Sequence, residues 1–213
     1  MMSHSRTLPI SVMALSLAAT LTSCSQNETP SLLQPSKALG TVLAEEATRL
    51  AGANKRVAIV APDASWGPAS TAEQAFRDAL SKQGFQIVVA GSPNVGNPMR
   101  RGQLGLTAED FVAALEKSAD AGAFVSFAGA PLLKPSEAGR LRANHPPVLI
   151  VATTSLGNVS GLWSDPVQLA SLIDADVVKL AIIDNPEPTP SAGKHDATHD
   201  LFAEHFRILR PPK

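Results

Sequence analysis

The sequence predicts an α/β fold: a doubly wound, mainly parallel sheet of five or six strands with helices on both faces, a three-layer sandwich in one domain. Two observations predict it. Short apolar runs recur along the chain, and most are nearly continuous rather than alternating, as in strands buried on both faces. Segments with helical periodicity lie between them, with short connections. The expected strands are Val57–Ala61, Phe85–Ala90, Ala123–Ala128, Val148–Ala152 and Lys179–Ile183.

The helices between these strands are predicted from caps and apolar spacing. Ser36 is expected to cap the first helix, which ends at Gly52. Thr107 stands three residues before Asp110, close to a capping box. The expected apolar faces are Leu39, Val42, Leu43, Ala47 and Leu50; Ala72, Ala75, Phe76, Ala79 and Leu80; Phe111, Ala114 and Leu115; and Val167–Ile173 after the cap Asp165 and Pro166, with a shorter helix from Ser136 to about Arg142.

Two segments interrupt this alternation. Gly91–Leu106 is long, rich in glycine and proline, and contains the pair Arg100 and Arg101. A loop of this length is usually functional or mobile. Asn185–Asp200 contains three prolines and is expected to be an exposed excursion. The chain then returns over Leu201–Leu209 as a final helix or an edge strand, and we favour a short edge strand at Phe206–Leu209.

Composition and charge exclude several classes of function. The 213 residues carry a formal net charge of −1, so the chain has no strongly basic character for binding nucleic acid. Aromatic residues make up 4% and tyrosine is absent, which argues against sites built on stacked rings. A hydrophobic content of 44% is enough for a real core. The expected class is one ordinary globular domain without nucleic-acid partners.

The N-terminus has the pattern of an export signal that ends at the only cysteine, Cys24. A polar start with one arginine, Met1–Arg6, precedes the apolar stretch Leu8–Leu21, which is shorter than the roughly 20 apolar residues of a membrane span. An aliphatic residue, two small residues and the cysteine then follow (Leu21-Thr22-Ser23-Cys24). This resembles the lipobox of bacterial lipoproteins, which implies cleavage before Cys24 and diacylglycerol on its sulfur.

The lipobox divides the chain into a signal peptide (1–23), a lipidated tether (24–35) and an α/β domain (36–213). The tether is polar, with prolines and little periodicity. Lipidation implies a membrane-anchored location in the cell envelope, and Ser25 after the cysteine favours the outer membrane if the source has two membranes. The alternative is a soluble protein whose apolar N-terminal segment is unstructured and whose Cys24 thiol is unmodified and has no function.

Several segments together resemble type 1 periplasmic binding proteins, most of all the second lobe of the branched-chain amino-acid binding group. The resemblance covers about residues 36–130 and depends on the order and spacing of short elements. It implies an α/β lobe of the kind that closes on a solute. The residues are Lys55–Asp63 with Trp66 and Gly67, Ala75–Leu80 with Gly84, and Asp110, Phe111, Ala114–Lys117, Ala121 and Val125–Phe127.

Those receptors have two lobes that enclose their ligand, whereas this chain has room for one. A single lobe forms half of a cleft and does not bury most of a small ligand's surface. Either two copies of the module dimerise and form a ligand cleft between them, or the module has lost its ligand and binds a protein partner instead.

Candidate contact residues follow the carboxyl ends of the expected strands, where open α/β sheets bind ligands. Asp63, Ser65 and Ser70 flank a helix start, which suits an anion; the alternative is that Asp63 and Ser70 only cap the turn. Trp66 is expected either to contact a partner or to pack at the edge of the core. Three more residues follow buried strands: Gly129, Thr153 and Thr154. They are expected either to contact a ligand or only to form the turn by which the chain leaves the strand.

Other polar groups give weaker indications. Arg100 and Arg101 suit a carboxylate or a lipid phosphate, or are simply solvated. His195 and His199 have the i, i+4 spacing of metal ligands on a helix, but with His205 they form a polar tail without a firm helical pattern. We therefore predict no metal site. No phosphate-binding loop or catalytic constellation is present in the sequence, so we also predict no cofactor and no enzymatic activity.

These observations together predict a membrane-anchored envelope lipoprotein that acts as a non-enzymatic binding or scaffold module. The alternative is a solute-binding protein whose cleft is completed by homodimerisation or by a partner lobe. The expected partners are the membrane, through the lipid on Cys24, and either an envelope protein or a second copy of the chain.

Overall fold

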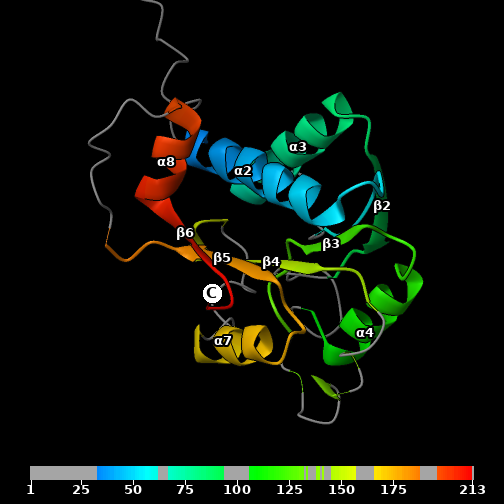
Figure 1. Cartoon of the computed structure of the whole chain (residues 1–213). Coiled ribbons are helices and arrows are strands. Elements are labelled where there is room, and N and C mark those ends of the chain that lie inside the picture. The colour runs from blue at the N-terminus through cyan, green and yellow to red at the C-terminus, as the bar shows by residue number, and fades with distance from the viewer. Residues whose placement is uncertain are drawn as a thin grey trace, which may run out of the picture.

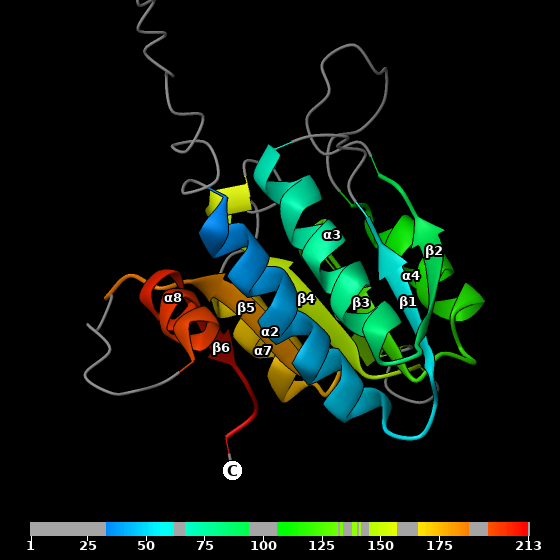
Figure 2. The same ribbon diagram turned by 90° about the horizontal axis from the view of Figure 1, so that it is seen from above.

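The computed structural model contains a six-stranded sheet with the order β2-β1-β3-β4-β5-β6 (Figures 1 and 2). The structure describes residues 33–61, 67–93, 106–131, 133, 138, 139, 141, 145–156, 166–187 and 196–212. Strands β1 to β5 are parallel, and β6 pairs antiparallel with β5. The strands are β1 Arg56–Val60, β2 Gln86–Gly91, β3 Ala123–Ser126, β4 Val148–Ala152, β5 Leu180–Asp184 and β6 Phe206–Leu209. All five expected strands are present, and so is the edge strand at Phe206–Leu209.

Helices cover both faces of the sheet, as predicted (Figure 1). Helices α2, α3 and α8 lie on one face, and α4 and α7 lie on the other. A short 3-10 helix, η1, follows β4. The doubly wound, three-layer sandwich is therefore confirmed. The helices are α2 Gln34–Ala51, α3 Gly67–Lys82, α4 Ala108–Lys117, η1 Thr154–Leu156, α7 Pro166–Asp174 and α8 Ala197–His205.

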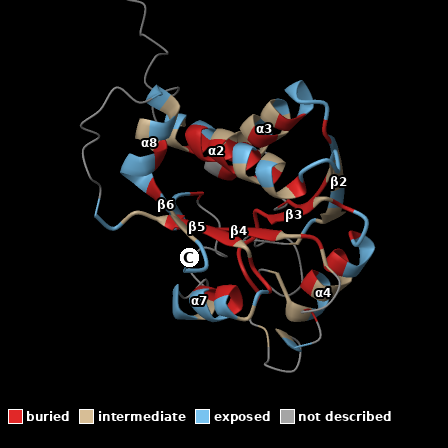
Figure 3. Cartoon of the chain, viewed as in Figure 1, coloured by how far each residue is buried: buried red, intermediate tan, exposed pale blue. Residues whose placement is uncertain are grey.

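The two faces of the sheet have separate apolar cores. Phe76 of α3 meets Phe127 edge to face in one core, with ring centroids 5.3 Å apart. Phe111 of α4 meets Phe124 of β3 in the other, with centroids 5.7 Å apart. Strands β3 and β4 are buried along their whole length (Figure 3). Continuous burial explains why the apolar runs do not alternate.

The helix ends agree in part with the predicted caps. Thr107 Oγ1 accepts a hydrogen bond from the backbone N–H of Asp110 at 3.0 Å, as the capping pattern predicts. Gly52 follows α2 with φ +59, as expected of a helix stop. The prediction that Ser36 caps α2 is wrong: the helix begins at Gln34, and Ser36 is buried inside its first turn. Pro35 explains the earlier start, because proline suits the first turn of a helix.

The C-terminal segment forms both a helix and a strand, where the sequence left the two as alternatives. Two side-chain contacts join this segment to α2, one from His199 on α8 and one from Arg210, which follows β6. His199 Nε2 lies 2.9 Å from Glu45 Oε2, and Arg210 donates to Glu46 at 2.5 Å. Glu45 and then Asp196 raise the pKa of His199 by hydrogen bonding and charge, against a smaller opposing effect of burial. Helix α8 is held mainly by Phe202, which is buried in the same core as the inner face of α2, with Leu201 packed against that core.

Helices α2 and α3 approach closely at Gly40. A Cβ at this position would lie 2.2 Å from the backbone oxygen of Ala72 and 2.9 Å from the Cβ of Ala75. Backbone cannot move aside as a flexible side chain can, so only glycine fits at this crossing. The close approach buries Leu39 and Leu43 beneath α2.

We predict that Gly40→Ala lowers the free energy of unfolding by roughly 1–3 kcal/mol, because the new methyl group forces the helices apart. Gly139→Ala is the matched control, since a Cβ there meets nothing within 4 Å. It should leave stability unchanged or raise it by up to about 1 kcal/mol, because alanine favours a helix more than glycine does. Urea unfolding followed by circular dichroism measures both. Equal stabilities of wild type and Gly40→Ala would contradict this packing.

Candidate functional site

The carboxyl edge of the parallel sheet is the candidate functional site. The chain leaves β1 toward β2 on one side and then crosses to β3 on the other, so the strand order reverses between β1 and β3. Open α/β sheets bind ligands in the crevice beyond the strand ends at such a point. Helix α2 precedes β1 and α3 follows it, and both run antiparallel to β1. Both helices therefore begin at the carboxyl edge (Figure 2).

A cluster of hydroxyl groups at this edge encloses a carboxylate of the same chain. Asp184 ends β5, and Thr153–Ser155 follow the neighbouring strand β4. Asp184 Oδ1 accepts from the hydroxyls of Thr153 at 2.6 Å and Ser155 at 2.7 Å. Asp184 Oδ2 accepts from the hydroxyl of Thr154 at 2.7 Å and from its backbone N–H at 2.8 Å. Four donors therefore join the ends of β4 and β5.

These hydrogen bonds determine the charge state of Asp184. Burial alone would raise the pKa of this half-buried carboxyl group, but the donors of Thr153, Thr154 and Ser155 together hold it below its usual range. Hydrogen bonds to the ionised form favour that form. The carboxylate therefore stays charged at neutral pH and holds the three donors in place.

A tight turn fixes the end of β3 beside the point where the strand order reverses. Ser126, the last residue of β3, donates its hydroxyl to the backbone oxygen of Gly129 at 2.7 Å. Gly129 has φ +79, a conformation that other residues adopt only with strain. Both residues are buried. Gly129 therefore shapes the edge through its backbone.

A cavity of about 260 Å³ opens next to the ends of β1 and β2. Val60 and Gly91 line it from the sheet, and α4 contributes Asp110 and Lys117, which supply one charge of each sign. The remaining lining residues are Ala90, Ser92, Pro93, Leu106, Ala113 and Ala114. Small side chains with a few polar groups suit a small polar molecule.

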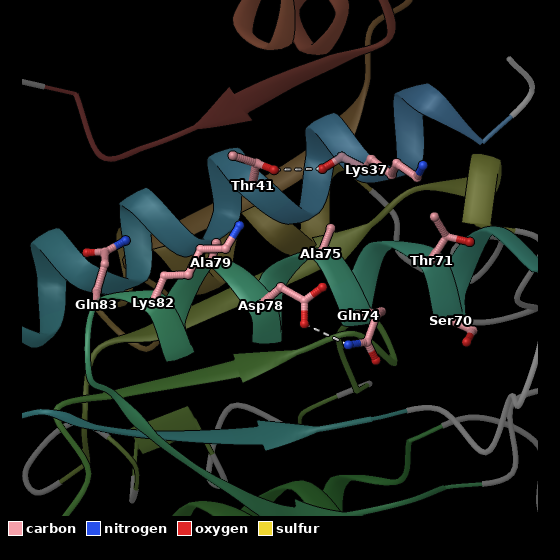
Figure 4. A pocket seen from close by; sticks show the side chains of 10 residues that line it. All are labelled: Lys37, Thr41, Ser70, Thr71, Gln74, Ala75, Asp78, Ala79, Lys82 and Gln83. Atoms are coloured by element: carbon pink, nitrogen blue, oxygen red, sulfur yellow. Dashed lines mark hydrogen bonds between the residues drawn. The ribbon is translucent and has the colours of Figure 1, made fainter. Parts of the chain in front are cut away.

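A second, larger groove of about 740 Å³ lies between α2 and α3, on a helical face (Figure 4). Lys37 and Lys82 lie toward its two ends, with Asp78 between them. The other lining residues are Thr41, Ser70, Thr71, Gln74, Ala75, Ala79 and Gln83. Most of the lining residues thus have polar side chains, although their apolar parts also line the groove.

The predicted contact residues have different outcomes. Thr153 and Thr154 lie together at the carboxyl edge, but their hydroxyls already bind Asp184. Ser70 belongs to α3 and lines the groove against α2. Asp63, Ser65 and Trp66 lie outside the described residues, as do Cys24, His195 and the pair Arg100 and Arg101.

Sequence reasoning missed Asp184 as a partner of the hydroxyl cluster. The available signal was its position directly after the apolar run Leu180–Ile183, at the carboxyl end of an expected strand. Ser155, the third hydroxyl, follows the predicted Thr154.

The histidine tail is divided by the start of α8. His199 and His205 lie on α8, where His199 contacts Glu45 and Asp196; His195 lies outside the described residues. Among the described residues, no group of three or more His, Cys, Asp or Glu side chains is placed to hold a metal ion. Within the same residues, no helix has both the length and the hydropathy needed to cross a membrane.

Comparisons with known proteins find the fold but no close relative. No protein-family model and no curated protein matches the sequence. Among solved structures, AraP, an arabinose binding protein from Geobacillus stearothermophilus, matches with a TM-score of 0.51 and 10% identity over 82% of this chain and 60% of its own. GanP, a glucose-galactose binding protein from the same organism, matches with a TM-score of 0.48 and 13% identity over 82% and 60%.

A periplasmic ribose ABC transporter from Conexibacter woesei matches with a TM-score of 0.44 and 18% identity, over 70% of this chain and 45% of its own. This chain thus spans about half the length of the solved structures it matches. At such identities the similarity to AraP establishes the fold alone. The described domain has the fold of one lobe of a type 1 periplasmic binding protein. The finer similarity to the branched-chain amino-acid group stays a prediction.

We predict that Asp184→Asn lowers the free energy of unfolding at pH 7 by about 1 kcal/mol, the low end for a charged hydrogen-bonded group, because the site is half-buried and solvent screens it. The pKa of Asp184 is lower in the folded than in the unfolded chain. Its stabilisation is therefore complete above the unfolded value, about 3.9, and is lost as the pH falls through the folded value.

Urea unfolding between pH 7 and pH 2.5 measures this difference. The stabilities of wild type and Asp184→Asn should converge at the acid end. Glu187→Gln, which removes an exposed acid three residues further on, is the control and should behave as wild type. A gap between wild type and Asp184→Asn that does not narrow with acid would contradict the assignment.

Proposed function

We propose that this chain is a non-enzymatic binding protein of the cell envelope, whose lobe forms one wall of a ligand cleft at the carboxyl edge of the sheet. The observation that carries the proposal is a cavity at the carboxyl end of β1, the strand at which the strand order reverses. The arabinose binding protein AraP, whose fold is similar, binds a solute, which supports this class of function.

The rigidity of the edge favours binding. Asp184 crosslinks the ends of β4 and β5 through hydroxyl and backbone donors, and the Ser126 hydroxyl fixes the turn at Gly129. A wall that is already ordered loses little conformational entropy when a ligand binds. The polar groups of the edge therefore serve as a frame, and the neighbouring cavity supplies the contact surface.

The cavity needs a second wall. Its volume of about 260 Å³ falls below the roughly 300–1,000 Å³ of common ligand sites. A second lobe over the carboxyl edge would enlarge and enclose it. That lobe belongs either to a second copy of this chain or to another envelope protein.

The lipid anchor would place this edge beside a membrane. Helix α2 begins at the carboxyl edge, so the tether is attached at the same end as the cavity. Cys24 and Gln34 are ten positions apart, and an extended chain spans at most about 35 Å over that length. The binding edge therefore stays close to the lipid on Cys24. Ser25 favours the outer membrane as the site of anchoring if the source has two membranes.

A scaffold for an envelope protein is the second candidate function. The groove of about 740 Å³ between α2 and α3 supports it, because residues of these two helices and of the turn after α3 line it and no strand residue does. Under this alternative the partner contacts the polar side chains shown in Figure 4.

Solute binding is tested by thermal unfolding of the full chain in detergent, against a panel of monosaccharides, amino acids and short carboxylic acids. A compound at one hundred times its Kd stabilises the fold by about 2.7 kcal/mol, which gives a clear rise in Tm. Ala113→Phe fills the cavity and should abolish the rise. Ala119→Phe, at an exposed position beyond α4, is the matched control and should retain it.

A chain whose Tm no compound raises would contradict solute binding and favour the scaffold function. Equal responses of wild type and Ala113→Phe would place the ligand elsewhere than in the cavity.

A further inference from the structure

Strand β2 is an edge strand whose own sequence lacks the usual protection against pairing with another strand. Strand β2 ends the sheet, and among the described residues it pairs with β1 alone. Its sequence, Gln86–Gly91 (QIVVAG), contains neither a charged residue nor a proline. Proteins usually protect such an edge with lysine, proline or a short strand, because free backbone groups recruit another strand.

The opposite edge of the sheet has the protection that β2 lacks. Strand β6 is only four residues long, contains Arg207 and leads into Arg210 and two prolines. Its partner β5 runs antiparallel to it. The contrast within one sheet identifies β2 as the edge that is open to a further strand.

The direction of the backbone groups follows from the pairing with β1. The N–H of Gln86 donates to the backbone oxygen of Lys55 at 2.7 Å, so Gln86 faces β1. Because backbone groups alternate along a strand, the N–H and C=O of Val88 also point toward β1. The N–H and C=O of Ile87 and Val89 then point away from β1, toward the free edge. The register shifts after Ile59, where Val60 pairs with Gly91, so the regular part of the free edge ends at Val89.

Val89 adds an apolar contact to these free backbone groups. It is 52% exposed and is one of two large hydrophobic residues that are exposed among the described residues; the other is Val167, on α7. Ile87 is half-buried against the core under α2 and α3. The edge therefore carries both unpaired hydrogen-bonding groups and apolar surface.

We propose that two copies of this chain pair antiparallel through β2, about a two-fold axis at Val88. In this register Ile87 of each copy lies opposite Val89 of the other, and each such pair exchanges two N–H···O bonds. The edge is complementary to itself, because both outward residues offer one donor and one acceptor. It carries no charge that would repel a second copy. An isologous contact of this kind closes as a dimer.

This dimer goes beyond the proposed function and constrains it. Antiparallel pairing of the two β2 strands directs the two carboxyl edges in opposite directions. The second copy therefore does not cover the cavity at the end of β1. The second wall of the cleft is then supplied by a different protein.

The test is the protein mass of the full chain in detergent, measured by size-exclusion chromatography with light scattering. The wild type should be a dimer and Val89→Lys a monomer. Val167→Lys alters the other exposed valine and should remain a dimer. Circular dichroism shows whether each variant keeps the fold.

Val88→Cys provides a second test that does not depend on weakening the edge. Val88 meets its own copy at the axis as a non-hydrogen-bonded pair, with Cα atoms about 4.5 Å apart, within the range of a disulfide. In a Cys24→Ala background, mild oxidation should therefore crosslink Val88→Cys into a dimer, whereas Cys24→Ala alone should stay uncrosslinked. A monomeric wild type overturns the proposal. So does a Val89→Lys dimer, a Val167→Lys monomer, or a Val88→Cys chain that does not crosslink.

Discussion

The burial of the central strands on both faces is the constraint on which the rest of the structure depends. Strands β3 and β4 expose no residue, and β1 and β5 expose almost none. Such a sheet is stable only when a helical layer covers each face. The close crossing at Gly40 provides one layer by bringing α2 onto α3, and α4 and α7 provide the other. Polar chemistry is thereby confined to the ends and outer edges of the sheet.

The polar groups at the carboxyl edge of the sheet mainly serve the structure of the chain itself. A carboxylate and three hydroxyls would form an attractive ligand site, yet here they bind one another and fix the ends of β4 and β5. The cavity beside β1 and β2 is the contact surface that we propose in their place. The tether enters at the same edge, so structural rigidity, the candidate cavity and the proposed anchor meet in one region of the molecule.

The fold was predictable from sequence because its main signal is local. Continuous apolar runs identified the five parallel strands, and Thr107 identified the start of α4. The partner of the hydroxyl cluster was not predictable, since Asp184 lies 29 to 31 positions from those residues and reaches them only through strand order. Helix α8 was missed as a firm element because Phe202 is its only fully buried residue, which leaves almost no apolar period. Its side-chain partner Glu45 belongs to a distant helix, α2.

The central claim is that an anchored lobe keeps its binding edge beside the membrane. The most direct measurement uses the full chain in liposomes that contain a headgroup-labelled quencher lipid, with a fluorophore on one introduced cysteine. In Glu187→Cys the fluorophore is at the carboxyl edge. In Ala53→Cys it is at an exposed position just beyond the other end of α2, a helix of 18 residues that is about 27 Å long and begins at the carboxyl edge. The account predicts stronger quenching at position 187, and no quenching at either position once Cys24→Ala is added. Equal or stronger quenching at position 53, or quenching that survives Cys24→Ala, would contradict it.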